Sequence, residues 1–145
     1  MTQTITNAVV EIAEVVAGTT GIKAPQANPR ENASEYPFAM VYLLEGDVGS
    51  ESEGWIVDLH NFAIDILVPR EWDLAVSLPL FHPILDTLKV VLFQEVAKTG
   101  GGAFNGSIDT FSSLRIMFLP EYNYAGIDMI GYRVMMEQVK LVGTL

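Results

Sequence analysis

The chain has 145 residues, a length that fits one domain, and we expect a single domain over residues 1–145. Half of the residues are apolar even without counting glycine, and 18% are charged, whereas an average soluble domain is about 45 to 50% apolar with glycine included and about 25% charged. This excess indicates buried contacts beyond those within one copy. Because the chain has no cysteine, disulfides and thiolate metal sites are excluded.

Acidic residues outnumber basic ones by eighteen to eight, which gives a formal net charge of −10. No Lys or Arg occurs between Arg30 and Arg70. A surface formed by this acidic interval would repel the phosphate backbone of nucleic acids. The interval is either a solvated acidic loop that aids solubility or a surface past which nucleic acid slides without being held. The candidates for lining such a channel are Glu45, Asp47, Glu51 and Glu53.

The N-terminal segment does not have the pattern of a secretion signal. No basic region precedes its apolar part, and Glu11 and Glu14 interrupt that part. The longest apolar runs, such as residues 90–93, are far shorter than the roughly 18 residues that a membrane span requires. We therefore expect a soluble protein that is made in the cytoplasm and has no membrane partner.

The first half of the chain predicts a helix, a loop and a strand. Apolar residues at positions 5, 8, 9, 12, 15 and 16 have helical spacing, and Gly18 marks the end of this helix. Residues 19–36 hold two prolines and many small polar residues, so they are expected to form a connecting loop. Residues 37–44 predict a short apolar strand, and residues 45–54 predict the acidic tip of a hairpin.

A long strand over residues 53–70 carries two apolar patterns in succession. Side chains alternate between the two faces of a strand. One face therefore holds Trp55, Val57 and Leu59, and the opposite face holds Phe62, Ile64, Ile66 and Val68. The change at His60 and Asn61 predicts either a bulge or a strand with apolar partners on both faces.

The second half predicts a helix and two more strands. The main helix is expected at about 80–98, after a short turn at 72–78, because proline is tolerated in a first helical turn but not in the middle of a helix. The segment KTGGGAFNG predicts a mobile loop, and strands follow at about 108–119 and 127–141, separated by the turn PEYNYAG. In the last strand, one face holds Ile130, Tyr132, Val134 and Met136, and the other holds Met135, Val139 and Leu141.

These elements predict an α+β fold in the order α-β-β-α-β-β. The sheet is expected to be mostly antiparallel and four-stranded, with long strands and two helices packed on it. Strands of roughly 15 residues exceed the usual five or six. They therefore project past the core, or pack against partners on both faces, or contain bulges within a compact sheet.

Few residues suggest catalysis. His60 and His82 are not spaced like a metal pair, and Ser112 and Ser113 lie in a strand instead of a nucleophile elbow. The glycine-rich loop lacks the G-K-[ST] ending of a phosphate-binding loop. His60 is better explained as a hydrogen-bonded histidine at a bulge than as a general base. We therefore expect no enzyme activity, no cofactor and no metal site.

Aromatic residues at the ends of loops predict an interface instead. Buried aromatic anchors are common where proteins meet, and the second apolar face is expected to belong to a neighbouring subunit. The candidates are Trp55, Val57, Leu59, Phe104, Tyr122 and Tyr124. The basic residues are too scattered for sequence-specific binding of nucleic acid.

The layout as a whole resembles the tail-terminator or tail-completion proteins of long-tailed bacteriophages and related tail and neck ring proteins. The resemblance rests on a first helix ending in TGIK, the loop APQANPRENASEYPFAMVYL that runs into the first strand, a hairpin, a helix and two final strands. It implies a virion protein that forms a ring with copies of itself, commonly a hexamer. The ring would stop polymerisation of the tail tube and meet the head connector or neck protein, and DNA would pass through its acidic lumen.

A second hypothesis is a small ligand-binding α+β module that dimerises through its sheet. It requires a concave apolar pocket between helix and sheet. The polar groups expected to converge on that pocket are His60, Asn61 and Arg133.

Overall fold

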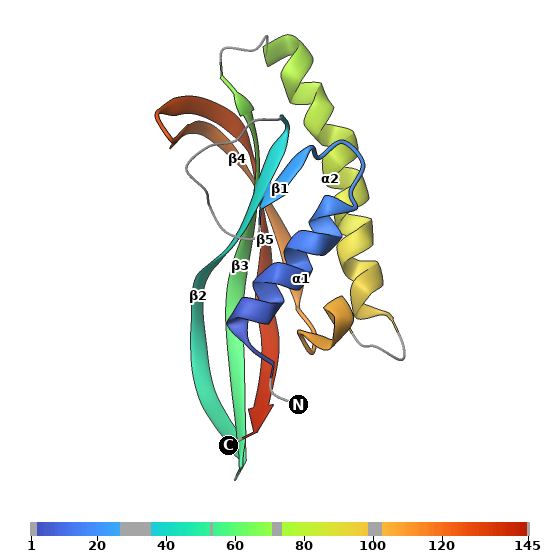
Figure 1. Cartoon of the computed structure of the whole chain (residues 1–145), viewed down its shortest axis with the longest axis vertical. Coiled ribbons are helices and arrows are strands. Elements are labelled where there is room, and N and C mark those ends of the chain that lie inside the picture. The colour runs from blue at the N-terminus through green and yellow to red at the C-terminus, as the bar shows by residue number, and fades with distance from the viewer. Residues whose placement is uncertain (1–2, 27–35, 53, 71–73, 99–102, 145) are drawn as a thin grey trace.

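Two helices pack on one face of a five-stranded sheet in the computed structural model of the chain (Figure 1). The structure describes residues 3–26, 36–52, 54–70, 74–98 and 103–144. Its elements are α1 (Ile5–Ala17), β1 (Ala24–Gln26), β2 (Phe38–Ser52), β3 (Trp55–Pro69), α2 (Leu74–Val96), the 3-10 turn η1 (Ala103–Gly106), β4 (Ser113–Tyr124) and β5 (Ile127–Thr144).

The strand order across the sheet is β1-β2-β3-β5-β4. Strand β1 is parallel to β2, and the other neighbouring pairs are antiparallel. The predicted α+β class and the order of the long elements are therefore confirmed. We call the face covered by α1 and α2 the inner face of the sheet and the opposite face its outer face.

Helix α1 follows the predicted pattern closely. The backbone N–H of Asn7 donates to Thr4 Oγ1 at 3.2 Å, which caps the first turn, and the helix ends at Gly18. Its buried side places five apolar residues in the core: Ala8, Val9, Ile12, Ala13 and Val16.

Strand β1 was not predicted, because it lies within the expected loop of residues 19–36. Ala24 to Gln26 pair with Phe38 to Met40 of β2. Pro25 cannot donate a backbone hydrogen bond, but β1 is the outermost strand on its side of the sheet, where that loss is tolerated. Residues 27–35 of the same loop lie outside the described part of the chain.

Helix α2 is longer than predicted. It begins at Leu74 and continues through Pro79 and Pro83, whereas the sequence predicted a separate turn before a helix at about 80. Both prolines are exposed and lie four residues apart, so the weakened turns lie on the solvent side of the helix. The opposite side is held in the core by Phe81, Leu85, Leu88 and Leu92.

Both hairpins contain more strand and less loop than predicted. The expected acidic tip at 45–54 is mostly strand, because β2 and β3 remain paired out to Ser52 and Trp55. Strand β4 begins at residue 113, later than predicted, and the expected proline and aromatic turn is shortened to Ala125 and Gly126. These two residues have φ of 54° and 80°, as tight hairpin turns require.

The change of face at His60 and Asn61 coincides with bulges in both neighbours of β3. Leu43 of β2 pairs with Phe62, but Glu45 pairs with Asn61, so Leu44 is an extra residue in β2. Strand β3 itself gains no residue here. Its predicted two faces are therefore present as predicted, and the bulges lie beside it.

The bulge in β5 is made by Glu137 and Gln138, which together lie opposite Asn61. Gln138 has φ of 53°, and its N–H donates to Asn61 Oδ1 at 3.0 Å. Because an extra residue reverses the alternation of faces, Val139 and Leu141 join the main core on the inner face. The prediction that they lie on the other face is wrong for this reason.

A second, smaller apolar cluster lies on the outer face. It contains Phe38, Met40, Leu67 and Met129. The β4–β5 hairpin curls away from the helices (Figure 1). Its Tyr122 and Tyr124 pack against this cluster. Residues 62–69 of β3 are therefore buried within one molecule. The expectation that a neighbouring subunit covers the second apolar face is wrong for this half of the strand.

Candidate functional site

Beyond the bulges, the sheet continues past the start of α1 as a narrow ribbon (Figure 1). We call this part the distal ribbon: residues 45–52 of β2, 55–60 of β3 and 139–144 of β5. Antiparallel pairing joins β3 to both neighbours along it. The bulges at its base fix which side chains point to each face.

The outer face of the distal ribbon carries the predicted apolar row. Trp55 is 46% exposed and Leu59 is 42% exposed, and Val57 between them is partly buried. Leu59 pairs directly with Asp47 of β2. Because directly paired residues project to the same face, an acidic side chain lies beside the apolar row.

Part of the predicted interface and part of the predicted acidic channel therefore lie on one surface. Glu45 pairs with Asn61, two residues from Leu59, and both Glu45 and Asp47 are exposed. Glu51 lies further along β2, and Glu53 lies outside the described residues. We call the surface formed by Glu45, Asp47, Trp55, Val57 and Leu59 the ribbon face.

The β2 side of the ribbon face is negatively charged, and Lys140, which pairs with Leu59 on the β5 side, lies 3.9 Å from the carboxylate of Asp109. A shallow hollow of about 260 Å³ at its base is lined by Glu45, Gly46, Asp47, Leu59, Asn61 and Gln138. The amide of Asn61 donates to Glu45 Oε1 at 3.2 Å. Neither Glu45 nor Asp47 has an ion pair within the described part of the chain. The face can therefore attract cations and repel phosphates.

His60 lies at the same level but on the inner face, where it is buried. Its Nε2 lies 3.0 Å from Asp58 Oδ2, and its ring lies over Gly46. A Cβ atom added to Gly46 would come within 1.7 Å of His60 Nδ1. The histidine is therefore a hydrogen-bonded group that packs against a bulged strand.

Three other predicted interface residues are not free surface anchors. Phe104 is fully buried in η1 with φ of 50° and lies 6.5 Å, between ring centroids, from Phe111. The prediction that Phe104 is an interface residue in a mobile loop is wrong, because its ring is buried in the core; residues 99–102 of the predicted loop lie outside the described residues. Tyr122 and Tyr124 are partly buried over the second cluster, where Tyr124 lies 5.4 Å from Phe38.

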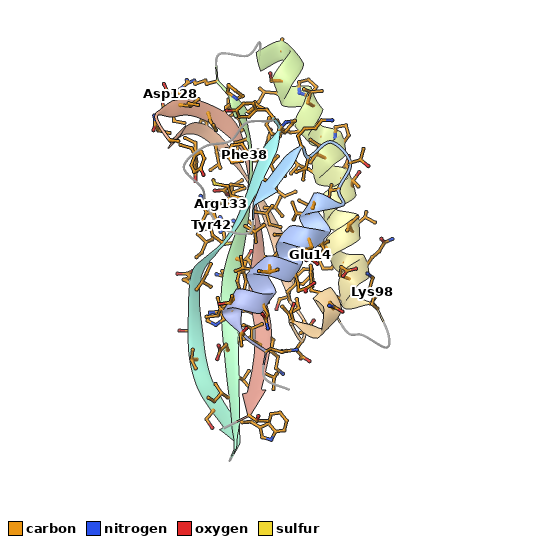
Figure 2. All side chains as sticks on the ribbon, in the orientation of Figure 1. Glu14, Phe38, Tyr42, Lys98, Asp128 and Arg133 are labelled. Carbon is orange, nitrogen blue, oxygen red and sulfur yellow. The ribbon has the colours of Figure 1, made fainter. Side chains whose placement is uncertain are left out.

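The sequence did not predict the polar cluster at the centre of the outer face. Asp65 is fully buried, and Arg133 holds it through Nε to Oδ1 at 2.7 Å and Nη2 to Oδ2 at 3.1 Å. The Tyr42 hydroxyl donates to Asp65 Oδ2 at 2.5 Å and accepts from Arg133 Nη2 at 2.7 Å. Figure 2 shows Tyr42 and Arg133 together at mid-sheet, with Phe38 further along β2.

The electrostatics of this cluster oppose proton transfer. Burial, followed by the hydrogen bond to Asp65, raises the pKa of Tyr42, and burial also raises the pKa of Tyr122. The hydrogen bond to Asp65 raises the pKa of Arg133. The phenols therefore stay neutral and the guanidinium stays charged, as expected of a structural clamp. In the sequence, the cluster is marked by Asp65 and Arg133, each of which is a single charge within an apolar stretch of strand.

The pocket required by the ligand-binding hypothesis is not formed by the predicted residues. His60 is on the inner face, whereas Arg133 pairs with Asp65 on the outer face. Asn61 is engaged by the two bulges through Glu45 and Gln138. The prediction that His60, Asn61 and Arg133 converge is therefore wrong.

A larger apolar groove lies elsewhere, between α2 and β4. Its volume is about 700 Å³, and it is lined by Lys89, Val90, Phe93, Gln94, Ala97, Ser112, Ser113, Leu114 and Ile116. Val90, Phe93 and Ile116 are all exposed. We call it the α2–β4 groove, and it is a second apolar surface remote in sequence from the ribbon face.

The described residues show two further absences. Within the described residues, no three His, Asp or Glu side chains gather in a group that could hold a metal ion. Neither described helix is long and apolar enough to cross a membrane. No protein-family model matches this chain, and no curated protein sequence matches it significantly.

Proposed function

We propose that this protein is a structural ring protein of a long-tailed bacteriophage. Copies of it form a ring, commonly a hexamer in proteins of similar layout, at the end of the tail tube. The ring stops polymerisation of the tube protein and joins the tail to the head connector or neck protein. The protein therefore acts in the virion, after assembly in the host cytoplasm.

The observation that carries the proposal is the division of exposed apolar surface between two unlike places. The ribbon face presents Trp55 and Leu59, and the α2–β4 groove presents Val90, Phe93 and Ile116. Exposed tryptophan and adjacent apolar residues are typical of the centres of protein interfaces. Two unlike patches on one chain favour head-to-tail contacts, which close into a ring when the rotation permits.

The charge of the ribbon face supports a channel for DNA. Glu45 and Asp47 are exposed beside the apolar row, and no ion pair neutralises them within the described residues. A lumen lined by such residues repels phosphates, so DNA passes through it and is not retained. The net charge of −10 acts in the same direction.

The polar clusters support a role without catalysis. Asp65, Arg133 and Tyr42 satisfy one another, and His60 pairs with Asp58 under a bulge. A catalytic acid or base needs a free position for substrate next to it. These groups stabilise the sheet instead.

The proposal is tested by imaging the purified protein with negative stain and by sedimentation, with and without isolated tail tubes. We expect closed rings and capping of tube ends. Trp55→Ala should weaken assembly at unchanged thermal stability, whereas Leu80→Ala on α2 should not. The control is matched because both side chains are 46% exposed. A particle that stays monomeric alone and with tubes would refute the proposal.

A second candidate function is binding of a small apolar ligand, which the α2–β4 groove favours through its size and its lining by Val90, Phe93 and Ile116. Thermal-shift measurements with a panel of apolar metabolites distinguish the two functions. Stabilisation of a monomer that never assembles would favour the ligand-binding module.

A further inference from the structure

We infer that neighbouring copies join by adding strands, so that β4 of one copy pairs with the outer edge of β2 in the next copy. This inference rests on the proposed self-association and goes beyond it by naming the two strands in contact. Four features of the structure carry it: the two edges, the strand directions, the charges and the apolar side chains.

Strand β4 is an unusually apolar edge. It is the last strand in the sheet order, with β5 on one side. Its segment SLRIMFL, residues 113–119, has no lysine and no proline, and Ile116 and Phe118 are each 45% exposed. Monomeric proteins blunt such edges with charged side chains, proline, bulges or covering segments, because an open apolar edge recruits another strand. Arg115 is the one charged residue over 113–119, and Pro120 with the bulge after Leu119 protects the edge beyond this segment, so residues 113–119 remain able to recruit a partner strand.

The second edge lies on the opposite side of the sheet. Within the described residues, β1 pairs with β2 as far as Met40. Residues 43–50 of β2 are all exposed, including Leu43 and Val48. One copy therefore offers two different strand edges, as a head-to-tail contact requires.

The strand directions match across the proposed contact. Neighbours β2, β3, β5 and β4 are antiparallel in turn, so β4 runs opposite to β2. Copies related by the ring axis keep the same orientation, and the strands must be tilted to that axis, because Arg115 is level through Met135 and Ala63 with Tyr42 and reaches Glu45 or Asp47 of the next copy only with a stagger. Strand β4 and the β2 of the next copy are then antiparallel, and the alternation continues from copy to copy without a break.

The outer faces of the two edges carry opposite charges. Arg115 pairs with Met135, and Met135 pairs with Ala63. Ala63 lies two residues from Asp65 and therefore on the outer face, so Arg115 also projects to the outer face. Arg115 is exposed and has no ion pair within the described part of the chain. Glu45 and Asp47 project to the outer face of β2. In a continuous sheet, the arginine and these carboxylates lie on one face and attract. Because each contact brings one arginine to two carboxylates, the assembled face keeps a negative charge for the proposed channel.

The inner faces of the two edges are both apolar. Ile116 pairs with Val134 of the main core, so it projects to the inner face. Leu43 pairs with Phe62 of the same core. Val48 pairs with Asp58, which lies on the same face of β3 as Phe62, so Val48 also projects to the inner face. Strand addition therefore places exposed apolar side chains together on the inner face while it pairs unlike charges on the outer face. This double match identifies a second copy as the partner of β4.

Cysteine cross-linking tests the contact directly, because the natural chain contains no cysteine. The variants Glu45→Cys/Arg115→Cys and Asp47→Cys/Arg115→Cys are oxidised and analysed by non-reducing electrophoresis. Each single variant can yield at most a dimer. We expect at least one double variant to form a ladder of covalent oligomers, since directly paired strand residues have Cβ atoms about 4.5 to 5.5 Å apart. The control pair Asp86→Cys/Arg115→Cys uses an exposed residue of α2 and should form no ladder.

Charge reversal gives an independent readout. Arg115→Glu should raise the concentration for half-assembly about tenfold, because it replaces a cross-strand attraction by a repulsion. Adding Asp47→Arg should restore assembly, whereas Lys23→Glu, an exposed change of the same charge just before β1 and outside the proposed contact of β4 with residues 43–50, should have no effect. If the wild type forms rings but no ladder appears and Arg115→Glu assembles normally, the inference is wrong and the proposed function stands. If the wild type forms no rings, both fail.

Discussion

Replacing Arg133 by methionine should be the most destabilising single change on the outer face of the sheet. Asp65 is fully buried, and this substitution removes the two guanidinium contacts at 2.7 and 3.1 Å. The Tyr42 hydroxyl would remain as a donor to the carboxylate. Breaking a buried pair by removing one partner costs about 3 to 5 kcal/mol, since it leaves an uncompensated buried charge.

We expect a loss near the lower end of that range, about 3 kcal/mol, because the Arg133 side chain is 21% exposed and water can reach the vacated space. For a chain of this length, each kcal/mol lowers the melting temperature by roughly 2 to 4 °C. The melting temperature should therefore fall by roughly 6 to 12 °C. Circular dichroism during thermal and urea unfolding measures both quantities.

The double variant Asp65→Asn/Arg133→Met is the control for the electrostatic cause. It removes both charges, so it should be more stable than Arg133→Met alone. Two results would contradict a stabilising role for the buried pair: a loss of less than about 1 kcal/mol in the free energy of unfolding of Arg133→Met, or a further loss when Asp65→Asn is added to that variant.

Three further changes test the bulges and the cluster. Gly46→Ala should cost about 1 to 3 kcal/mol in urea unfolding, since its Cβ would come within 1.7 Å of His60 Nδ1, and adding His60→Ala should restore part of the loss. Asn61→Ala should speed amide exchange at residues 137–139, because its side chain binds the β5 bulge. The raised pKa of Tyr42 means that the folded state holds a proton that the unfolded state loses above about pH 10. Stability therefore falls as pH rises past that value, and the advantage of the wild type over Tyr42→Phe should shrink between about pH 8 and about pH 11; a constant difference would contradict the assigned cause.

The sequence predicted the helices and long strands well where one apolar period dominates. Helix α1 matched because its apolar residues follow one stripe and Thr4 and Gly18 mark its ends. The sequence predicts too late a start for α2, because proline is unfavourable in the middle of a helix. Both prolines are on the exposed side, and the buried leucines on the other side hold the helix together. Strand β1 could not be predicted, since its three residues form a strand only by pairing with β2.

The bulges limited how much of the candidate site could be predicted. Alternation alone assigned Val139 and Leu141 to a second face, but Gln138 reverses the pattern through a positive φ that glutamine rarely adopts. The row of Trp55, Val57 and Leu59 was predicted correctly, because β3 gains no residue. Its proximity to Glu45 and Asp47 depends on the register of β2, which the sequence does not specify. The Asp65–Arg133 clamp likewise depends on the pairing of β3 with β5.

One copy of this chain leaves apolar strand surface exposed, and we propose that other copies cover it. Electron micrographs of the purified wild-type protein, taken over a range of concentrations with and without tail tubes, test it most directly. We expect closed rings of uniform diameter with a central opening, some of them seated on tube ends. Single small particles at every concentration, with tube ends left bare, would contradict the claim.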